Sequence, residues 1–236
     1  MSFISGLVWC IVAVSIAILT MRYYLPYYRK TKMNTDAPDA SNAPVETQQT
    51  ISLIQGKSSR IIVLSVIGVF AALCGYFAQL NASNLLSYFK LAVGMLILFA
   101  VVITDMELFI IPNLFVLVLL GARIIFFIIE LFVLGSSAWM LLLNNFLVGI
   151  GIMFFLIIMS KITRGGLGAG DCKLYGALGF LCGMNTVLYA LLFALIISAM
   201  LSLILLISRK KRLRDSFPLG PFVCLGCGLT IILSVA

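Results

Sequence analysis

Histidine is absent from this 236-residue sequence, and charged residues make up only 10% of it. Without histidine, the chain cannot form a histidine general base, a histidine-activated nucleophile or a histidine metal site. Hydrophobic residues make up 63% of the sequence, and the mean hydropathy is +1.19. A soluble domain is usually roughly 45–50% apolar. The composition therefore excludes a soluble domain and predicts an all-α, polytopic membrane protein.

Acidic residues are also few, because the chain has 8 of them against 16 basic residues, for a net charge of +8. A strong positive charge can indicate nucleic-acid binding. Here, however, the basic residues are scattered at the ends of apolar runs and form no basic domain. We therefore expect no nucleic-acid partner, and we interpret the positive charge as a determinant of membrane orientation.

Apolar runs recur along the whole chain, and a membrane-spanning helix needs around 20 such residues. They predict about eight spans, at residues 3–25, 61–80, 88–104, 112–134, 138–160, 173–183, 186–207 and 218–236. Residues 1–30 form a first anchor in this interpretation, and residues 61–236 form a seven-helix membrane domain. Residues 31–60 are predicted to be a short flexible linker, since small polar residues dominate their first two thirds.

The positions of lysine and arginine predict which ends of the spans face the cytoplasm. With the N-terminus outside, fourteen of the 16 basic residues fall in cytoplasmic segments. The exceptions are Lys90, in an outer segment, and Arg123, within the fourth span. Arg123 and Glu130 lie seven residues apart and so share a helical face, which predicts a structural ion pair. No basic residue precedes the first span, so we expect an anchor there and not a cleavable signal peptide.

The six cysteines lie in or beside apolar runs. Cys224 and Cys227 have the spacing of a metal-binding or redox pair, but a single such pair in an apolar segment is a weak signal. We therefore expect buried free cysteines and no metal site.

Two aspartates differ from the other acidic residues, because each lies at the cytoplasmic boundary of a predicted span. Asp105 follows the third span, and Asp171 ends a glycine-rich loop at residues 165–170. Carboxyl groups are expensive to keep in a membrane unless they carry out chemistry or carry an ion. We expect these two to meet and to share a proton, since neighbouring carboxylates do not readily both ionise. Such a pair can hydrolyse a peptide bond.

Helix dipoles suggest separate roles for the two aspartates. Asp105 closes a helix, where the dipole raises a carboxyl pKa, and Asp171 opens one, where the dipole lowers it. This predicts Asp171 as the general base and Asp105 as the general acid. The glycines before Asp171, including Gly168 and Gly170, allow the backbone to lie along an extended substrate. A simple turn between two spans is the alternative.

Three segments in the same order resemble those of the bacterial type IV prepilin peptidases. They are Gly168-Ala169-Gly170-Asp171-Cys172-Lys173-Leu174, Thr104-Asp105 followed by Ile111-Pro112-Asn113, and Phe217-Pro218-Leu219-Gly220-Pro221-Phe222. The resemblance implies an aspartyl endopeptidase of the bacterial inner membrane that removes the leader peptide from type IV prepilin or pseudopilin precursors at the cytoplasmic face. It further implies Asp105 and Asp171 as the catalytic pair, membrane lipid as the surroundings, and the pilus or type II secretion machinery as partners.

The resemblance also implies cofactors for which this sequence offers less support. Many members of the family methylate the new N-terminus with S-adenosylmethionine and carry a zinc-binding domain with two Cys-x-x-Cys pairs after the first span. Residues 27–60 contain no cysteine and leave no room for that domain. We therefore expect no zinc, and methylation stays open.

The predicted substrate-binding residues are Gly168, Gly170, Lys173, Glu107, Pro112 and Asn113. Lys173 has two possible roles, which are to tune the pKa of Asp171 or to anchor its helix at the membrane surface. Glu107 could attract a basic leader peptide or could be a solvated surface residue.

Two other functions stay open at this point. One is an intramembrane protease similar to presenilin or signal peptide peptidase. The resemblance to those enzymes is weaker, because their first aspartate motif is Tyr-Asp, whereas Thr104 precedes Asp105 here, and because this sequence has no Pro-Ala-Leu segment. The other is an ion or proton carrier, although carriers usually place their acids near the bilayer midplane. A purely structural assembly subunit is the remaining alternative.

Overall fold

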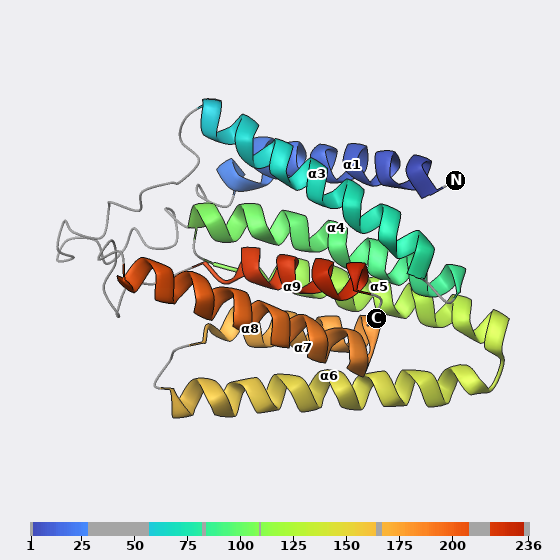
Figure 1. Ribbon diagram of the computed structural model, residues 1–236. Helices are drawn as coiled ribbons and strands as arrows, with labels where there is room; N and C mark the ends of the chain where they lie inside the picture. The colour runs from blue at the N-terminus through green and yellow to red at the C-terminus, as the bar shows by residue number, and fades with distance from the viewer. Residues whose placement is uncertain are drawn as a thin grey trace.

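The computed structural model describes residues 2–27, 57–81, 84–108, 110–163, 167–207 and 218–233. Every element in these ranges is a helix, which confirms the all-α prediction (Figure 1). The helices are α1 (Ser2–Leu19), a π-helical turn η1 (Thr20–Tyr24), α3 (Lys57–Asn81), α4 (Leu85–Leu108), α5 (Asn113–Leu134), α6 (Ser137–Ile162), α7 (Ala169–Cys182), α8 (Met184–Ile207) and α9 (Gly220–Ile232).

Six of these helices are long and apolar enough to cross a membrane: the continuous helix of α1 and η1, and α3, α4, α5, α6 and α8. The polytopic prediction is therefore confirmed, but neither α7 nor α9 is long enough to count among these six. α7 is longer than the 11 residues predicted for it (173–183), whereas α9 is shorter than the predicted span at 218–236. α7 has 14 residues and α9 has 13. At 1.5 Å per residue they extend about 20 Å, less than the roughly 30 Å of a hydrocarbon core.

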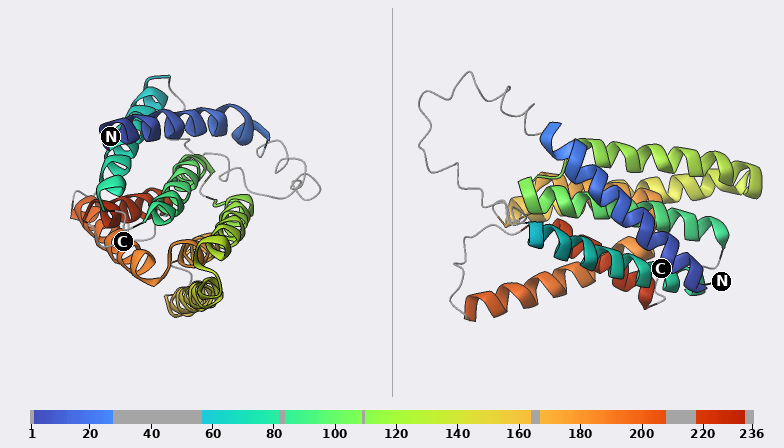
Figure 2. Two further views of the ribbon diagram at one scale, coloured as in Figure 1. Left: turned by 90° about the vertical axis from the view of Figure 1, so that its right-hand side faces the viewer. Right: turned by 90° about the horizontal axis from the view of Figure 1, so that it is seen from above.

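α4 is the central helix of the bundle. It contacts α1, α3, α5, α7 and α9, while α1 pairs with α3, α6 with α7, and α8 with α9. Figure 2 shows α4, in green, between the α1–α3 pair and the remaining helices. Twelve of its 24 residues are buried, although its sequence is apolar on all sides. A helix without a polar face is stable only when protein or lipid surrounds it.

Large apolar side chains cover the outside of the bundle. Phe132 is 86% exposed and Met140 is 77% exposed. Exposed apolar surface on this scale indicates contact with another apolar phase, which for these spans is lipid. Inside the bundle, small residues allow close helix packing: a Cβ atom on Gly149 would lie 2.7 Å from the carbonyl oxygen of Gly176, so α6 and α7 meet backbone to backbone.

The predicted ion pair between Arg123 and Glu130 is confirmed, with the Arg123 Nη1 donating to Glu130 Oε2 at 2.7 Å. Lys90, predicted to lie in an outer segment, also pairs with Glu130. Beside this cluster is a cavity of about 1060 Å³. It lies between the first turns of α4, the last turns of α5 and the adjoining ends of α6, α7 and α8.

Several predicted boundaries were wrong. α4 continues to Leu108, so Asp105 lies within this helix and not after it. α7 begins at Ala169, so Asp171 lies in its first turn and not in the preceding loop. Of the predicted linker, only residues 57–60 are described, and they form the first turn of α3. Apolar composition alone does not mark where a helical hydrogen-bond ladder begins or ends.

Candidate active site

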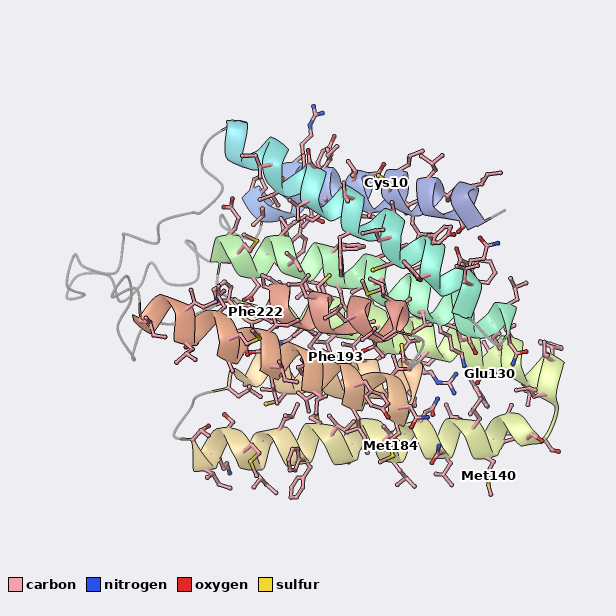
Figure 3. All side chains as sticks on the ribbon, in the orientation of Figure 1. Cys10, Glu130, Met140, Met184, Phe193 and Phe222 are labelled. Carbon is pink, nitrogen blue, oxygen red and sulfur yellow. The ribbon has the colours of Figure 1, made fainter. Side chains whose placement is uncertain are left out.

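The two aspartates lie at the same end of the bundle, where α4 ends and where α7 and α9 begin. Both are buried, with Asp105 5% exposed and Asp171 8% exposed. Figure 3 labels Phe222, near the start of α9, at this end and Glu130 near the opposite end. The carboxyl groups and the Lys90 cluster therefore occupy opposite ends of the molecule.

Asp105 is held by α9. The main-chain N–H of Gly220 donates to its Oδ2 at 2.6 Å. A Cβ atom on residue 220 would lie 2.9 Å from that oxygen, closer than real Cβ contacts, so only glycine brings this N–H to the carboxylate without displacing it. Gly220 was not among the predicted site residues. Its signal was its place in the proline-glycine-proline segment of the family resemblance.

Asp171 is held from within its own helix turn. The main-chain N–H of Gly168 hydrogen bonds its carboxyl group. A Cβ atom on residue 168 would lie 2.8 Å from Asp171 Oδ2, so the predicted need for glycine here has a local cause. The other oxygen, Oδ1, is buried and has no hydrogen-bond partner among the described residues. This oxygen therefore has hydrogen-bonding capacity that the described residues leave unused.

Burial raises the pKa of Asp171 to about 7, and the negative charge of Asp105 adds to the shift, against the opposing hydrogen bond from Gly168. Asp171 lies outside the six candidate spans. The influence of Asp105 shows that the two carboxyl groups are close enough to interact. The predicted lowering of the Asp171 pKa by the helix dipole was wrong, because loss of hydration outweighs a dipole effect of about 1 kcal/mol.

The other predicted site residues fall into two groups. Lys173 Nζ donates to Asn113 Oδ1 at 3.3 Å, and both side chains are exposed, so α7 and α5 are linked beside Asp171. Gly170 packs against Ile111, since a Cβ atom there would lie 3.1 Å from the Ile111 Cβ.

The second group lies beneath this surface. Pro112 is buried at the N-cap of α5, one position before the helix in which it was predicted. Glu107 is 6% exposed, which rules out the solvated-surface interpretation of this residue. Asp215, for which the sequence offers the same two interpretations as for Glu107, lies outside the described residues.

All six cysteines are free, as predicted. Within the described ranges, no three residues of the types His, Cys, Asp and Glu converge on a point where they could hold a metal ion. Cys224 and Cys227 are both buried in α9. The absence of zinc stays a prediction.

These features define a class: a helical membrane protein in which paired, buried carboxyl groups from separate segments meet at one end of the bundle. The sequence profile of the type IV leader peptidase family matches residues 92–203, a range that contains both aspartates. The prepilin leader peptidase/N-methyltransferase of Bacillus subtilis (strain 168) is 26% identical over 145 residues, which are 60% of this chain and 54% of that protein. The chain therefore spans about half the length of this relative.

No solved structure matches the chain. The profile and the relative together confirm the predicted resemblance to the type IV prepilin peptidases.

Proposed function

We propose that this protein is an aspartyl endopeptidase that removes the leader peptide from type IV prepilin or pseudopilin precursors. The observation that carries the proposal is the burial of Asp105 and Asp171 at the same end of the bundle, where burial and, to a lesser extent, the charge of Asp105 raise the pKa of Asp171 to about 7. Two buried carboxyl groups that share a proton at neutral pH supply an acid and a base at one place. The match to type IV leader peptidases supports the choice of substrate.

The chemistry follows from the environment of each carboxyl group. Asp171, protonated, donates a hydrogen bond from its free oxygen to the carbonyl of the scissile peptide bond. Asp105, ionised and held by the Gly220 N–H, takes a proton from a water molecule, whose oxygen attacks the carbonyl carbon. The proton then passes to the leaving nitrogen as the C–N bond breaks, and the pair returns to its singly protonated form. This assignment reverses the roles that helix dipoles alone predicted.

The depth of the pair favours peptide cleavage over ion transport. Asp105 lies three residues before the end of α4, so its Cα is about 4.5 Å from the end of that helix. A peptide that approaches from the adjoining water can reach this depth without crossing the bilayer. A carrier needs its acid near the midplane, where both sides of the membrane have access in turn.

The cellular setting of the proposal depends on the charge distribution of the chain. The end that carries the aspartates is the one predicted to be cytoplasmic, because most lysines and arginines fall there. We therefore place cleavage at the cytoplasmic face of the inner membrane, with the pilus or type II secretion machinery as the recipient of the mature subunit. Lys173 and Asn113, linked to each other beside Asp171, are positioned to contact the substrate chain.

Methylation of the new N-terminus is a separate question, raised by the name of the relative. S-adenosylmethionine carries a sulfonium cation. The large cavity of the described bundle has two cations, Lys90 and Arg123, and one anion, Glu130, in or behind its wall. This net positive charge would repel the positively charged sulfonium group. No residue is assigned to this cofactor. The mass of the mature pilin N-terminus will show whether a methyl group is added.

The test is to co-express a type IV prepilin with Asp105→Asn and with Asp171→Asn variants and to follow leader removal on a gel. Asparagine has nearly the size of aspartate, but its amide group neither accepts nor donates a proton in acid–base catalysis. We therefore expect the rate of cleavage to fall by at least about 100-fold in each variant. Asp36→Asn, in the predicted linker, is the matched control and should cleave normally. Cleavage that persists in both site variants, when membrane fractions show normal insertion, would refute the proposal.

A further inference from the structure

The buried charge cluster at the far end of the bundle has more positive than negative charge. Glu130 accepts hydrogen bonds from Lys90, on α4, and from Arg123, on the same face of α5 about two turns away. Arg123 and Glu130 are fully buried, and the Lys90 side chain is 12% exposed. Two cations therefore share one carboxylate, and the cluster carries a formal charge of +1.

Arg123 also has hydrogen-bonding groups that the described residues do not satisfy. Its Nε and Nη2 are buried without a partner in the described part of the chain. Its guanidinium carbon lies 5.7 Å from the centre of the Phe180 ring. This cation–π contact stabilises the positive charge, but it gives the Nε and Nη2 groups no hydrogen-bond acceptor. Unpaired buried charge is strongly destabilising, so the cluster calls for an external negative charge.

The cavity of about 1060 Å³ beside this cluster has an amphipathic wall. Lys90 and Glu130 line it, and most of the remaining wall is leucine, isoleucine, valine and phenylalanine. The further polar residues of the wall are Asn84, Ser87, Asn145 and Thr186. This volume lies within the range of pockets that bind molecules with tens of non-hydrogen atoms. A small inorganic anion would leave the apolar part of the wall without a partner.

The depth of the charged wall matches the boundary between lipid headgroups and acyl chains. Lys90 lies five residues after the start of α4 and Glu130 four residues before the end of α5. At 1.5 Å per residue, both are about 6–8 Å inside the helix ends. In a bilayer this is the depth at which amphipathic groups anchor.

We propose that this cavity binds an anionic phospholipid, with the phosphate group next to Lys90 and one acyl chain along the apolar wall. The negative headgroup offsets the +1 charge of the cluster, and each Lys or Arg near a membrane surface attracts anionic lipid by about 1 kcal/mol. The site lies at the opposite end from Asp105 and Asp171, so the proposal does not depend on the protease assignment.

The test is native mass spectrometry of the full chain in detergent, with dioleoyl phosphatidylglycerol and dioleoyl phosphatidylcholine added at equal concentrations. These lipids have the same acyl chains and differ in headgroup charge. We expect the wild-type protein to bind the anionic lipid at least about fivefold more tightly, which is the effect of about one favourable basic group. Arg123→Met and Lys90→Met should each reduce the preference below about twofold.

Two matched controls separate a local effect from a general loss of positive charge. Arg22→Met and Lys161→Met remove exposed cations elsewhere on the bundle and should keep the fivefold preference. Lys90→Met also serves if Arg123→Met does not fold. Equal binding of the two lipids by the wild-type protein, or an undiminished preference in both cluster variants, would overturn the proposal. Displacement of the lipid by millimolar inorganic phosphate would also overturn it and would assign the site to a small anion.

Discussion

Substitution of Gly220 by alanine tests whether the contact from α9 organises the aspartate pair. The added Cβ would lie 2.9 Å from Asp105 Oδ2 and 3.0 Å from the Asp105 Cβ. Because the Asp105 Cβ is fixed to its helix, α9 must move away, and the 2.6 Å hydrogen bond from the Gly220 N–H must lengthen. A hydrogen bond to a charged group is worth about 1.5–3 kcal/mol, so we expect kcat/KM for leader removal to fall about 10-fold to 100-fold.

The matched control is Gly121→Ala, because a Cβ atom on Gly121, in α5, meets nothing within 4 Å. That variant should keep full activity and gain up to about 1 kcal/mol of stability from the better helix former. The assay is cleavage of a purified prepilin by each variant in the same detergent, with thermal unfolding measured in parallel. Full activity of Gly220→Ala at unchanged Tm would show that the contact does not position Asp105.

Three further predictions concern pH and charge. Activity should decline as the pH rises through about 7, since Asp171 then loses the proton it donates, and a pH–rate profile without a limb near 7 would contradict this assignment. The stability of the folded protein should also decrease between about pH 4 and pH 7, because the Asp171 pKa is raised above its ordinary value of 3.8, and thermal unfolding of Asp171→Asn should lack this component. Glu130→Gln should cost about 3–5 kcal/mol in denaturant unfolding, because Arg123 and Lys90 then lack their carboxylate; a cost below about 1 kcal/mol would mean that the cluster is hydrated.

The main features of the site could be predicted from sequence because charged residues are rare in this chain. An aspartate in an apolar context is visible without a structure, and Asp105 and Asp171 were chosen for that reason. The Arg123–Glu130 pair was also predictable, since residues seven apart share one face of a helix. Both signals are local, so each depends only on neighbouring sequence.

The features that could not be predicted depend on tertiary packing. Lys90 is 40 residues from Glu130, and Gly220 is 115 residues from Asp105. No local pattern joins these pairs. The pKa of Asp171 was also mispredicted, because a helix dipole can be estimated from sequence whereas the degree of burial by other helices cannot. The same limit applies to α9, which was predicted as a full span at residues 218–236 and is a helix of 13 residues.

The donor to Asp105 belongs to α9, which is synthesised after the two helices that carry the aspartates, and this has a consequence for biogenesis. A nascent chain that ends before residue 220 has both aspartates but cannot give Asp105 its hydrogen bond. Ribosome-bound intermediates that have already inserted α4 and α7 therefore lack the geometry of the finished pair. Maturation of the proposed catalytic centre is thereby coupled to the insertion of α9.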